Sequence, residues 1–262
     1  AQVITGGNYR CAIIGNIILE QNENSIAIEV WGEGNIVLGN VIDNSIRPGA
    51  DSIGIRAYPV SGEATIRTII ANNYIKKVAW GIWIEQFEQI IVEKNYIWAD
   101  VGIRLYNNVQ KAIVEGNLIY ASGYAGIDLK SGATNNVIKN NIICGNPNYG
   151  IIEETSSEDY NVIEGNKIEN WEIVAIQIQG ANTVVRNNIG YATENSGVVV
   201  FAITSSVTFE HGLAGTPTLV LVSFNNTDYG AWTWTANSTH ITITVTTANY
   251  NGTAYWYAEY KP

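Results

Sequence analysis

The chain has 262 residues, of which 46% are hydrophobic and 15% charged, and its formal net charge is −10. This size and composition exclude a disordered polypeptide and leave room for one large domain or two modest ones. The acidic balance would repel phosphate backbones and anionic lipid, and no apolar run approaches the roughly 18 residues of a membrane span, so we expect neither a nucleic-acid partner nor membrane insertion.

A short frame built around asparagine repeats through residues 1–202. The anchors are spaced by 22 to 25 residues, once by 33, and are Asn16, Asn40, Asn73, Asn95, Asn117, Asn141, Asn166 and Asn188. An Ile or Val lies three residues before each anchor, and a second apolar run such as "GIRL" or "GIDL" follows most anchors. Period-two alternation in runs this short predicts strands, and the interval is typical of a solenoid. We therefore predict an all-β chain that begins with a right-handed parallel β-helix of about eight coils.

The asparagine column has a structural explanation. Asn side chains at one corner of successive coils, about 4.8 Å apart, can hydrogen-bond to one another and to the turn backbone, and Asn tolerates left-handed turn conformations. We expect a ladder that holds the coils in register and has no direct role in function.

Strand parity turns the residue after each anchor outward. This column reads Ile17, Val41, Tyr74, Tyr96, Leu118, Ile142, Lys167 and Ile189, so seven of its eight members are apolar. A continuous apolar stripe on an outer face normally marks an interface, and we expect subunits to assemble through it. The alternative is that loops fold over the stripe.

The second strand of each coil presents two more outward columns. The first reads Glu29, Arg56, Trp83, Arg104, Asp128, Ile152, Gln177 and Val199, and the second reads Trp31, Tyr58, Glu85, Tyr106, Lys130, Glu154, Gln179 and Phe201. Aromatic rings beside carboxylates, Arg and Gln suit sugar binding, because pyranose faces stack on Trp and Tyr while hydroxyls need fixed polar partners. The alternative is a solvated face held by opposite charges on successive rungs, such as Arg104 with Asp128.

This face supplies the candidate site. The predicted substrate-binding residues are Trp31, Tyr58, Trp83, Arg104, Tyr106 and Lys130. Glycoside hydrolysis usually needs two carboxyl groups, and Asp128 and Glu154 lie one rung and two residues apart, about 8 Å between their backbones. Glu85 lies two rungs from Asp128 and is the third candidate catalytic carboxylate. The sequence leaves open whether the face cuts a glycan or only binds it. Glu153 falls in an inward slot, and we expect a bulge to turn it outward.

The sequence offers little for other chemistries. The only two histidines, His211 and His240, lie beyond the last repeat, so the repeats hold no Ser-His-acid triad and no His metal site. Cys11 and Cys144 belong to coils five rungs apart, about 24 Å by strand spacing, which is beyond disulfide reach. We expect neither a metal nor a cofactor.

Near residue 203 the repeat gives way to Thr-rich alternation with Gly and Asn turns. Four or five antiparallel strands fit residues 203–262, and we predict a small β-sandwich that caps the open end of the β-helix or forms a tip. Three N-x-S/T sequons in this segment, at Asn225, Asn237 and Asn251, hint at an extracellular surface.

The repeat frame, as in "VIEGNKIEN" and "AGIDLKSGATNNVIKNN", resembles the parallel β-helix repeats of carbohydrate-active enzymes, periplasmic copper-site accessory proteins and phage tailspikes. The segment "HGLAGTPTLVLV" resembles small β-sandwich domains at the tips of viral fibres. With no Met and many Ile, the combination looks most like the receptor-binding tailspike of a spindle-shaped virus of hyperthermophilic archaea.

This resemblance implies a thermostable homotrimer on the virion surface, outside the cell, that binds host-surface polysaccharide or glycoprotein glycan, with or without cutting it. The Gly-His-Gly and paired-Asp motifs of polygalacturonases and the Asp-Pro-His motif of alginate epimerases are absent. Two alternatives remain, because the fold alone does not decide function. One is an extracellular polysaccharide-degrading β-helix enzyme of non-viral origin, either a glycoside hydrolase or a lyase, and the other is a purely structural fibre.

Overall fold

The structure, a computed structural model, describes residues 4–6, 10–19, 25–45, 51–59 and 67–262. These residues form strands and turns, and no helix among them has the length and hydrophobicity to cross a membrane. The chain divides into two compact units, Ala1–Val184 with Asn188–Gly190 and Val185–Asn187 with Tyr191–Pro262. The first unit is a parallel β-helix and the second contains two antiparallel sheets.

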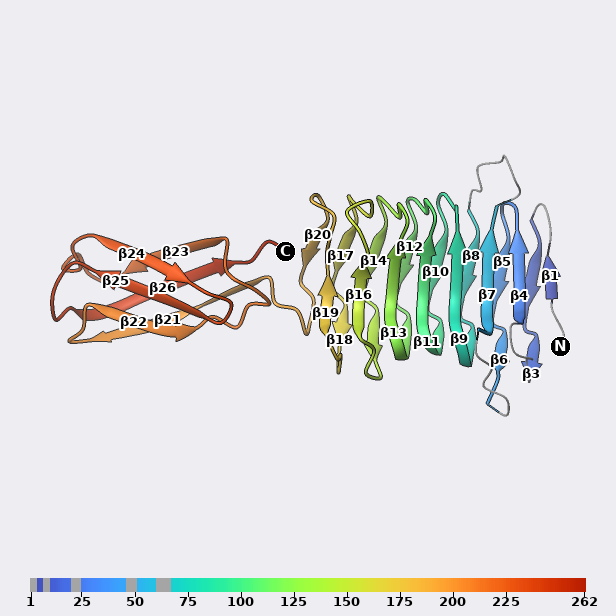
Figure 1. The fold of residues 1–262 in the computed structure, drawn as a ribbon, viewed down its shortest axis with the longest axis horizontal. Helices are drawn as coiled ribbons and strands as arrows, with labels where there is room; N and C mark the ends of the chain where they lie inside the picture. The colour runs from blue at the N-terminus through green and yellow to red at the C-terminus, as the bar shows by residue number, and fades with distance from the viewer. Residues whose placement is uncertain (1–3, 7–9, 20–24, 46–50, 60–66) are drawn as a thin grey trace. The chain divides into compact units, whose positions relative to one another are not determined.

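The coils of the first unit stack so that their strands lie side by side (Figure 1). One wall is an eight-stranded sheet in chain order, with β2 (Ala12–Ile14), β5 (Ile36–Leu38), β8 (Ile69–Ala71), β10 (Ile91–Glu93), β12 (Ile113–Glu115), β14 (Val137–Lys139), β17 (Val162–Glu164) and β20 (Val184–Arg186). Neighbours pair in parallel, as Val92 does with Val114. Eight stacked strands bound about seven complete turns, which confirms the predicted parallel β-helix.

The other two walls belong to one twelve-stranded sheet. The apolar wall, which follows the Asn corner, consists of β3 (Ile17–Leu19), β6 (Val41–Asp43), the first parts of β9 (Tyr74–Glu85), β11 (Tyr96–Tyr106) and β13 (Leu118–Lys130), then β15 (Ile142–Cys144) and β18 (Lys167–Ile168). The charged wall consists of β1 (Ile4–Gly6), β4 (Ile26–Trp31), β7 (Ile53–Tyr58), the second parts of β9, β11 and β13, then β16 (Tyr149–Glu153) and β19 (Val174–Gln177). The long strands β9, β11 and β13 pass from one wall to the other, with a register shift between Ala99 and Val101.

The predicted asparagine ladder is present along its full length. From Asn16 to Asn166, each anchor donates its backbone N–H and its Nδ2 to the Oδ1 of the anchor in the next coil, and Asn188 accepts the last pair, at 2.9 to 3.0 Å. The remaining Nδ2 proton goes to a backbone carbonyl, as from Asn117 to Val92. A buried amide left unpaired would cost about 1 to 3 kcal/mol, so this satisfied ladder fixes how the coils stack.

The glycine that opens the second strand is required by close packing between coils. A Cβ on Gly126 would lie 2.6 Å from the carbonyl oxygen of Gly150 and 2.4 Å from Cγ2 of Ile143. Gly126 and Ile127 are both buried, so two consecutive residues face the core and the strand alternation shifts by one at this point.

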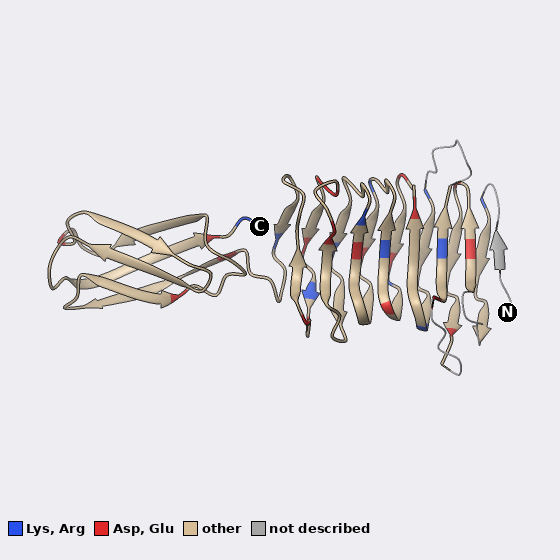
Figure 2. Cartoon of the chain, in the orientation of Figure 1, with Lys and Arg blue, Asp and Glu red and all other residues tan. Residues whose placement is uncertain are grey.

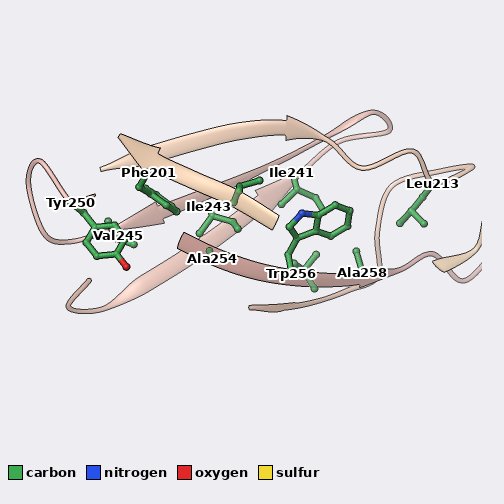
Figure 3. Close-up of a cluster of buried hydrophobic side chains, with 11 residues drawn as sticks. Phe201, Leu213, Ile241, Ile243, Val245, Tyr250, Ala254, Trp256 and Ala258 are labelled. Carbon is green, nitrogen blue, oxygen red and sulfur yellow. The ribbon is translucent and has the colours of Figure 1, made fainter. Parts of the chain in front are cut away.

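The second unit is a β-sandwich. One antiparallel sheet has the order β21 (Glu194–Ala202), β26 (Asn251–Glu259) and β23 (Leu219–Phe224), and the other has the order β22 (Ser206–Glu210), β25 (His240–Val245) and β24 (Trp232–Ala236). Both sheets contribute to one apolar core, shown in Figure 3, which includes Phe201, Ile243 and Trp256. The predicted sandwich is confirmed, with six strands where the sequence suggested four or five.

Strand β21 corrects the assignment of the last repeat. The sequence predicted that Val199 and Phe201 face outward from an eighth coil. Instead, β21 pairs antiparallel with β26, where Val199 lies opposite Ala254 and Phe201 opposite Gly252, and both side chains are buried in the sandwich core. A coil strand and a sandwich strand have the same alternation, so the pairing partner decides between them. Residues 194–202 thus lie in the second unit.

Candidate functional site

The charged wall carries the two outward columns that the sequence predicts. In order along the β-helix, the first is Glu29, Arg56, Trp83, Arg104, Asp128 and Ile152, and the second includes Trp31 beside Tyr58 and Glu85 beside Tyr106 and Lys130. Acidic and basic residues therefore occur on successive strands of this wall (Figure 2). Glu154 follows β16, and its N–H bonds to the carbonyl of Leu129. All nine predicted site residues belong to this one face.

Asp128 is completely buried, although it points away from the core of the coil. Its side chain has 0% exposed surface, and Arg104 holds its Oδ2 through Nε at 2.7 Å and Nη2 at 2.6 Å. The other oxygen, Oδ1, is buried without a hydrogen-bond partner in the part of the chain that the structure describes. A buried polar atom without a partner costs free energy, and because the side chain has no exposed surface, a ligand hydroxyl could bond to Oδ1 only after the covering side chains move.

Burial also changes the acidity of this group, raising the pKa of Asp128 from 3.8 to about 6. Desolvation is the largest cause, the positive charge of Arg104 opposes it, and the negative charge of Glu154 adds to it. A carboxyl that titrates near neutrality can both donate and accept a proton. The ion pair between Arg104 and Asp128 that the alternative predicts is formed, but at this rung it is buried instead of solvated.

Two aromatic rings contact Arg104, and a third packs against one of them. The Arg104 guanidinium lies 4.1 Å from the ring centre of Trp80 and 5.2 Å from that of Trp83. The two Trp rings are 5.0 Å apart, and Tyr106 meets Trp83 edge-on at 6.0 Å. Stacking on these rings orients the planar guanidinium toward Asp128. The buried Nε1 of Trp83 has no hydrogen-bond partner among the described residues.

Glu154, the second candidate carboxylate, is held by two neighbours. Nζ of Lys130 lies 2.5 Å from Oε2, and the hydroxyl of Tyr124 donates to Oε1 at 3.2 Å. Burial, followed by the charges of Glu154 and Asp128, raises the pKa of Tyr124 to about 12, so this hydroxyl stays protonated at neutral pH. The structure thus brings Asp128 and Glu154 to adjacent rungs, as predicted.

A second cluster centres on Arg56, two rungs from Arg104. The Arg56 guanidinium pairs with Glu85 at 3.1 Å and Glu29 at 3.7 Å, and it lies 5.0 Å from the ring centre of Tyr58. Trp31 extends this cluster, with its ring 6.2 Å from that of Tyr58. Glu85 is therefore bound to Arg56 and stands apart from the two other candidate carboxylates.

Sequence reasoning missed Trp80 and Tyr124. They lie within the long strands β9 and β13, just before the Gly at which the predicted second strand of the coil begins. No inward or outward direction was assigned to these positions from the sequence, yet each side chain contacts a predicted site residue. The signal was the Gly of the repeat: because two consecutive residues face inward at Gly81 and Ile82, the alternation restarts there. Applying that shift would have turned the Trp80 ring toward the outer face.

The predicted outward turn of Glu153 is wrong. Its side chain is fully buried and accepts hydrogen bonds from Thr183 Oγ1 at 2.6 Å, Asn161 Nδ2 at 2.9 Å, and the backbone N–H groups of Gly180 and Gln179. Burial raises the pKa of Glu153, and these four bonds oppose the shift. An inward carboxylate is tolerated because both of its oxygens have partners.

The stripe on the apolar wall is exposed, as predicted. Ile17 is 68% exposed, Leu118 39% and Ile142 43%. Tyr74 and Tyr96 stack on successive rungs at 4.9 Å, with ring planes 8° apart. Within the described ranges, these exposed fractions contradict the alternative that loops cover the stripe.

Metal-ligating residues do not gather in the structure. Among the residues it describes, no group of three or more His, Cys, Asp or Glu could hold a metal ion. Cys11 and Cys144 are free thiols in different coils. Both ring nitrogens of His211 are engaged by backbone, Nδ1 by the N–H of Leu213 and Nε2 by the carbonyl of Asn237.

A family model described as periplasmic copper-binding protein (NosD) matches residues 42–211, well over half of the chain. The chain belongs to the NosD family. Copper favours thiolate, thioether and imidazole ligands, yet the matched span of this NosD-family chain contains one Cys, Cys144, one His, His211, and no Met. Cys144 lies on β15 in the β-helix, and backbone groups occupy both nitrogens of His211. The described residues do not fit a copper site, and we assign no chemical step to copper.

Phage tailspikes are among the solved structures similar to this NosD-family chain. The Dettilon tailspike gp208 matches with a TM-score of 0.43 and 13% identity, over 95% of this chain and 68% of its own. A mutant tailspike of E. coli bacteriophage HK620 in complex with pentasaccharide has a TM-score of 0.43 and 10% identity, over 99% and 68%. The Pseudomonas phage phi297 tailspike gp61 has a TM-score of 0.40 and 11% identity, over 98% and 60%.

The NosD-family chain thus spans 60 to 68% of the length of these three tailspikes. At such identities and TM-scores, no residue role is carried over from them. No curated protein matches the chain significantly.

Proposed function

We propose that this chain is a receptor-binding tailspike that attaches to host-surface glycans through the charged wall. One observation carries the proposal: a row of aromatic rings and fixed polar groups on adjacent rungs, in which Asp128 Oδ1 and Trp83 Nε1 are buried without partners among the described residues. Pyranose faces stack on Trp and Tyr rings, and sugar hydroxyls both donate and accept hydrogen bonds. The wall matches both properties.

The sugar contacts would come from the residues that the sequence predicts. Trp83 and Tyr106 supply rings near Arg104, while Trp31 and Tyr58 supply rings near Arg56. Lys130 and Arg104 hold the two carboxylates in place. Both clusters lie on the same columns, so one glycan running across the strands would contact both.

We further propose that this face can cut the glycan, with Asp128 as general acid and Glu154 as general base. In its protonated form Asp128 would donate its proton to the glycosidic oxygen as the bond to the anomeric carbon breaks. Glu154, which pairs with Lys130, would accept a proton from the water that attacks this carbon. Glu85 is the third candidate, and it is tested separately because it lies in the Arg56 cluster.

The test has two arms on the same protein. Binding to a glycan array and to extracted host-surface polysaccharide is measured first, and new reducing ends are measured after incubation. Retention with no reducing ends identifies a binding spike, and reducing ends that vanish in Asp128→Asn identify a glycosidase. Absence of both would contradict the proposal and favour the structural fibre.

The apolar stripe supports a homotrimer. Its side chains are exposed over successive rungs of the apolar wall, and a continuous apolar patch of this kind normally becomes buried on assembly. Changing Tyr96 and Leu118 together to Glu should give dissociated or insoluble chains in sedimentation. Ile36→Glu is the matched control, since Ile36 is 38% exposed on the eight-stranded wall. If the double variant stays a soluble trimer, the stripe is not the interface.

The proposal places the chain outside the cell, on a virion surface. The sequence resemblance to tailspikes of spindle-shaped viruses of hyperthermophilic archaea supports this location and a thermostable fold. Thermal unfolding above about 90 °C is expected for such a protein. Antibody labelling of intact virions is the direct test, and its failure would favour an extracellular polysaccharide-degrading enzyme of non-viral origin.

A further inference from the structure

We infer that the charged wall selects neutral glycans and rejects anionic ones. The inference rests on the proposed function, because it concerns the ligand class of the same face. It follows from how the charges of this wall are paired, which the residue types alone do not determine.

Every cation of the two clusters is already bound to a carboxylate. Arg56 pairs with Glu29 and Glu85, Arg104 with Asp128, and Lys130 with Glu154, so three cations face four carboxylates. An anionic sugar could engage one of these cations only by displacing its partner, and the displaced carboxylate would then face the ligand. Like charges brought together in a partly buried site repel, so this exchange is unfavourable. The formal net charge of −10 adds a long-range repulsion.

The polar atoms that remain without partners suit hydroxyl groups. Among the described residues, Trp83 Nε1 and Arg56 Nε are buried donors and Asp128 Oδ1 is a buried acceptor, and all three lie in the same outward column. Once the side chains that cover these atoms move aside, separate sugar hydroxyls can accept from the two donors and donate to the Asp128 carboxylate. A carboxylate or sulfate group of a sugar can only accept, so it cannot satisfy Oδ1 of the ionised Asp128. Neutral sugars therefore complement all three atoms.

Matched polymers test this selectivity directly. The probes are a panel of neutral polysaccharides, including a mannan, a glucan and a galactan, and the uronate forms made by oxidising their primary alcohols. At low salt we expect the preferred neutral polymer to bind at least about tenfold more tightly than its oxidised form, a difference of about 1.4 kcal/mol. Trp83→Ala should weaken binding of the neutral polymer, which assigns the measured affinity to this face.

A charge variant changes the preference in a predicted direction. Glu29→Gln with Glu85→Gln removes both acidic partners of Arg56 and should raise the affinity for the oxidised polymer relative to the neutral one. The control is Glu88→Gln with Glu115→Gln, which removes the acidic partners of Lys111 and Lys139 outside the charged wall. This control should leave the preference unchanged.

The possible failures are distinguishable. If the oxidised polymer binds as tightly as the neutral one and Trp83→Ala weakens both, the face is a glycan site without the inferred selectivity, so the inference is overturned and the proposed function stands. If the Glu29 and Glu85 double variant gains nothing for the oxidised polymer, pairing does not set the preference, and the inference is likewise overturned. If no polymer binds in either form, the proposed function is contradicted, and the inference, which depends on it, is overturned as well.

Discussion

The Arg56 and Arg104 clusters contain the same residue types in the same column, yet their side chains differ in solvent exposure. The Arg104 side chain is 11% exposed and its single acid, Asp128, is 0% exposed. Arg56 is 32% exposed and is shared by two acids that are 17% and 18% exposed. The Trp80 ring, 4.1 Å from the Arg104 guanidinium, shields that side chain from solvent. The raised pKa of Asp128 thus accompanies the deeper burial of the Arg104 cluster, with desolvation as its largest cause.

The largest expected effect separates the clusters by chemistry. If the proposed cleavage occurs, Asp128→Asn should lower its rate by about 10² to 10⁴-fold, because a positioned general acid contributes about that much. Glu85→Gln should have a much smaller effect, since Glu85 pairs with Arg56 away from Asp128. Reducing-end release from the bound polysaccharide measures both. Equal losses in the two variants would show that the clusters act as one unit.

The second prediction separates them by stability. Because the pKa of Asp128 is raised from 3.8 to about 6 in the folded state, the folded chain keeps its proton where the unfolded chain has lost it. The free energy of unfolding should therefore fall as pH rises from about 4 to 6 and stay low above that, by up to about 3 kcal/mol. Asp128→Asn should make this fall smaller and leave the part that comes from Glu153, whose pKa is also raised.

Urea unfolding at pH 4.0 and pH 7.5 measures the effect. Glu115→Gln, on the eight-stranded wall, is the control and should retain the fall. A wild-type stability that rises across this pH range would show that Asp128 is ionised throughout, as in an ordinary surface pair.

The third prediction concerns the rings. Trp83→Ala should weaken glycan binding by about 1 to 2 kcal/mol, because it removes a stacking surface that contacts Trp80, Tyr106 and Arg104. Trp83→Phe keeps a ring but removes the free Nε1–H, so it should lose only the part carried by that donor. Isothermal titration with the bound glycan measures both variants. Identical affinities for wild type and both variants would remove this face from consideration.

The smallest expected effect concerns the hydrogen bond from Tyr124 that helps to hold Glu154. Tyr124→Phe removes the hydroxyl that donates to Oε1 at 3.2 Å, while Lys130 continues to hold Oε2. Loss of one such hydrogen bond costs about 0.5 to 1.5 kcal/mol, so cleavage should slow by about tenfold or less with little change in unfolding. A loss as large as that of Asp128→Asn would make Tyr124 part of the reaction itself.

Much of the fold could be predicted because the repeat fixes it. The Asn anchors and the inward Ile and Val residues repeat at every coil, and they led directly to the ladder and to the outward columns that carry Arg104 and Asp128. What the sequence missed depends on contacts between coils. The burial of Asp128, the place of Trp80 and the inward Glu153 follow from neighbours 24 to 30 residues away in sequence, which no local alternation reports. Val199 and Phe201 were misplaced for the same reason, since only β26 shows which sheet they join.

The asparagine ladder also makes the length of a coil independent of its stacking. Asn40 and Asn73 bond as neighbours at 3.0 Å although 33 residues separate them, whereas the other links span 22 to 25. Each bond between two anchors requires only that the chain return to the same corner of the β-helix. It does not depend on the length of the chain between the two anchors. The β-helix is therefore a modular scaffold, in which a loop can be lengthened or exchanged on one coil while the neighbouring coils keep their register.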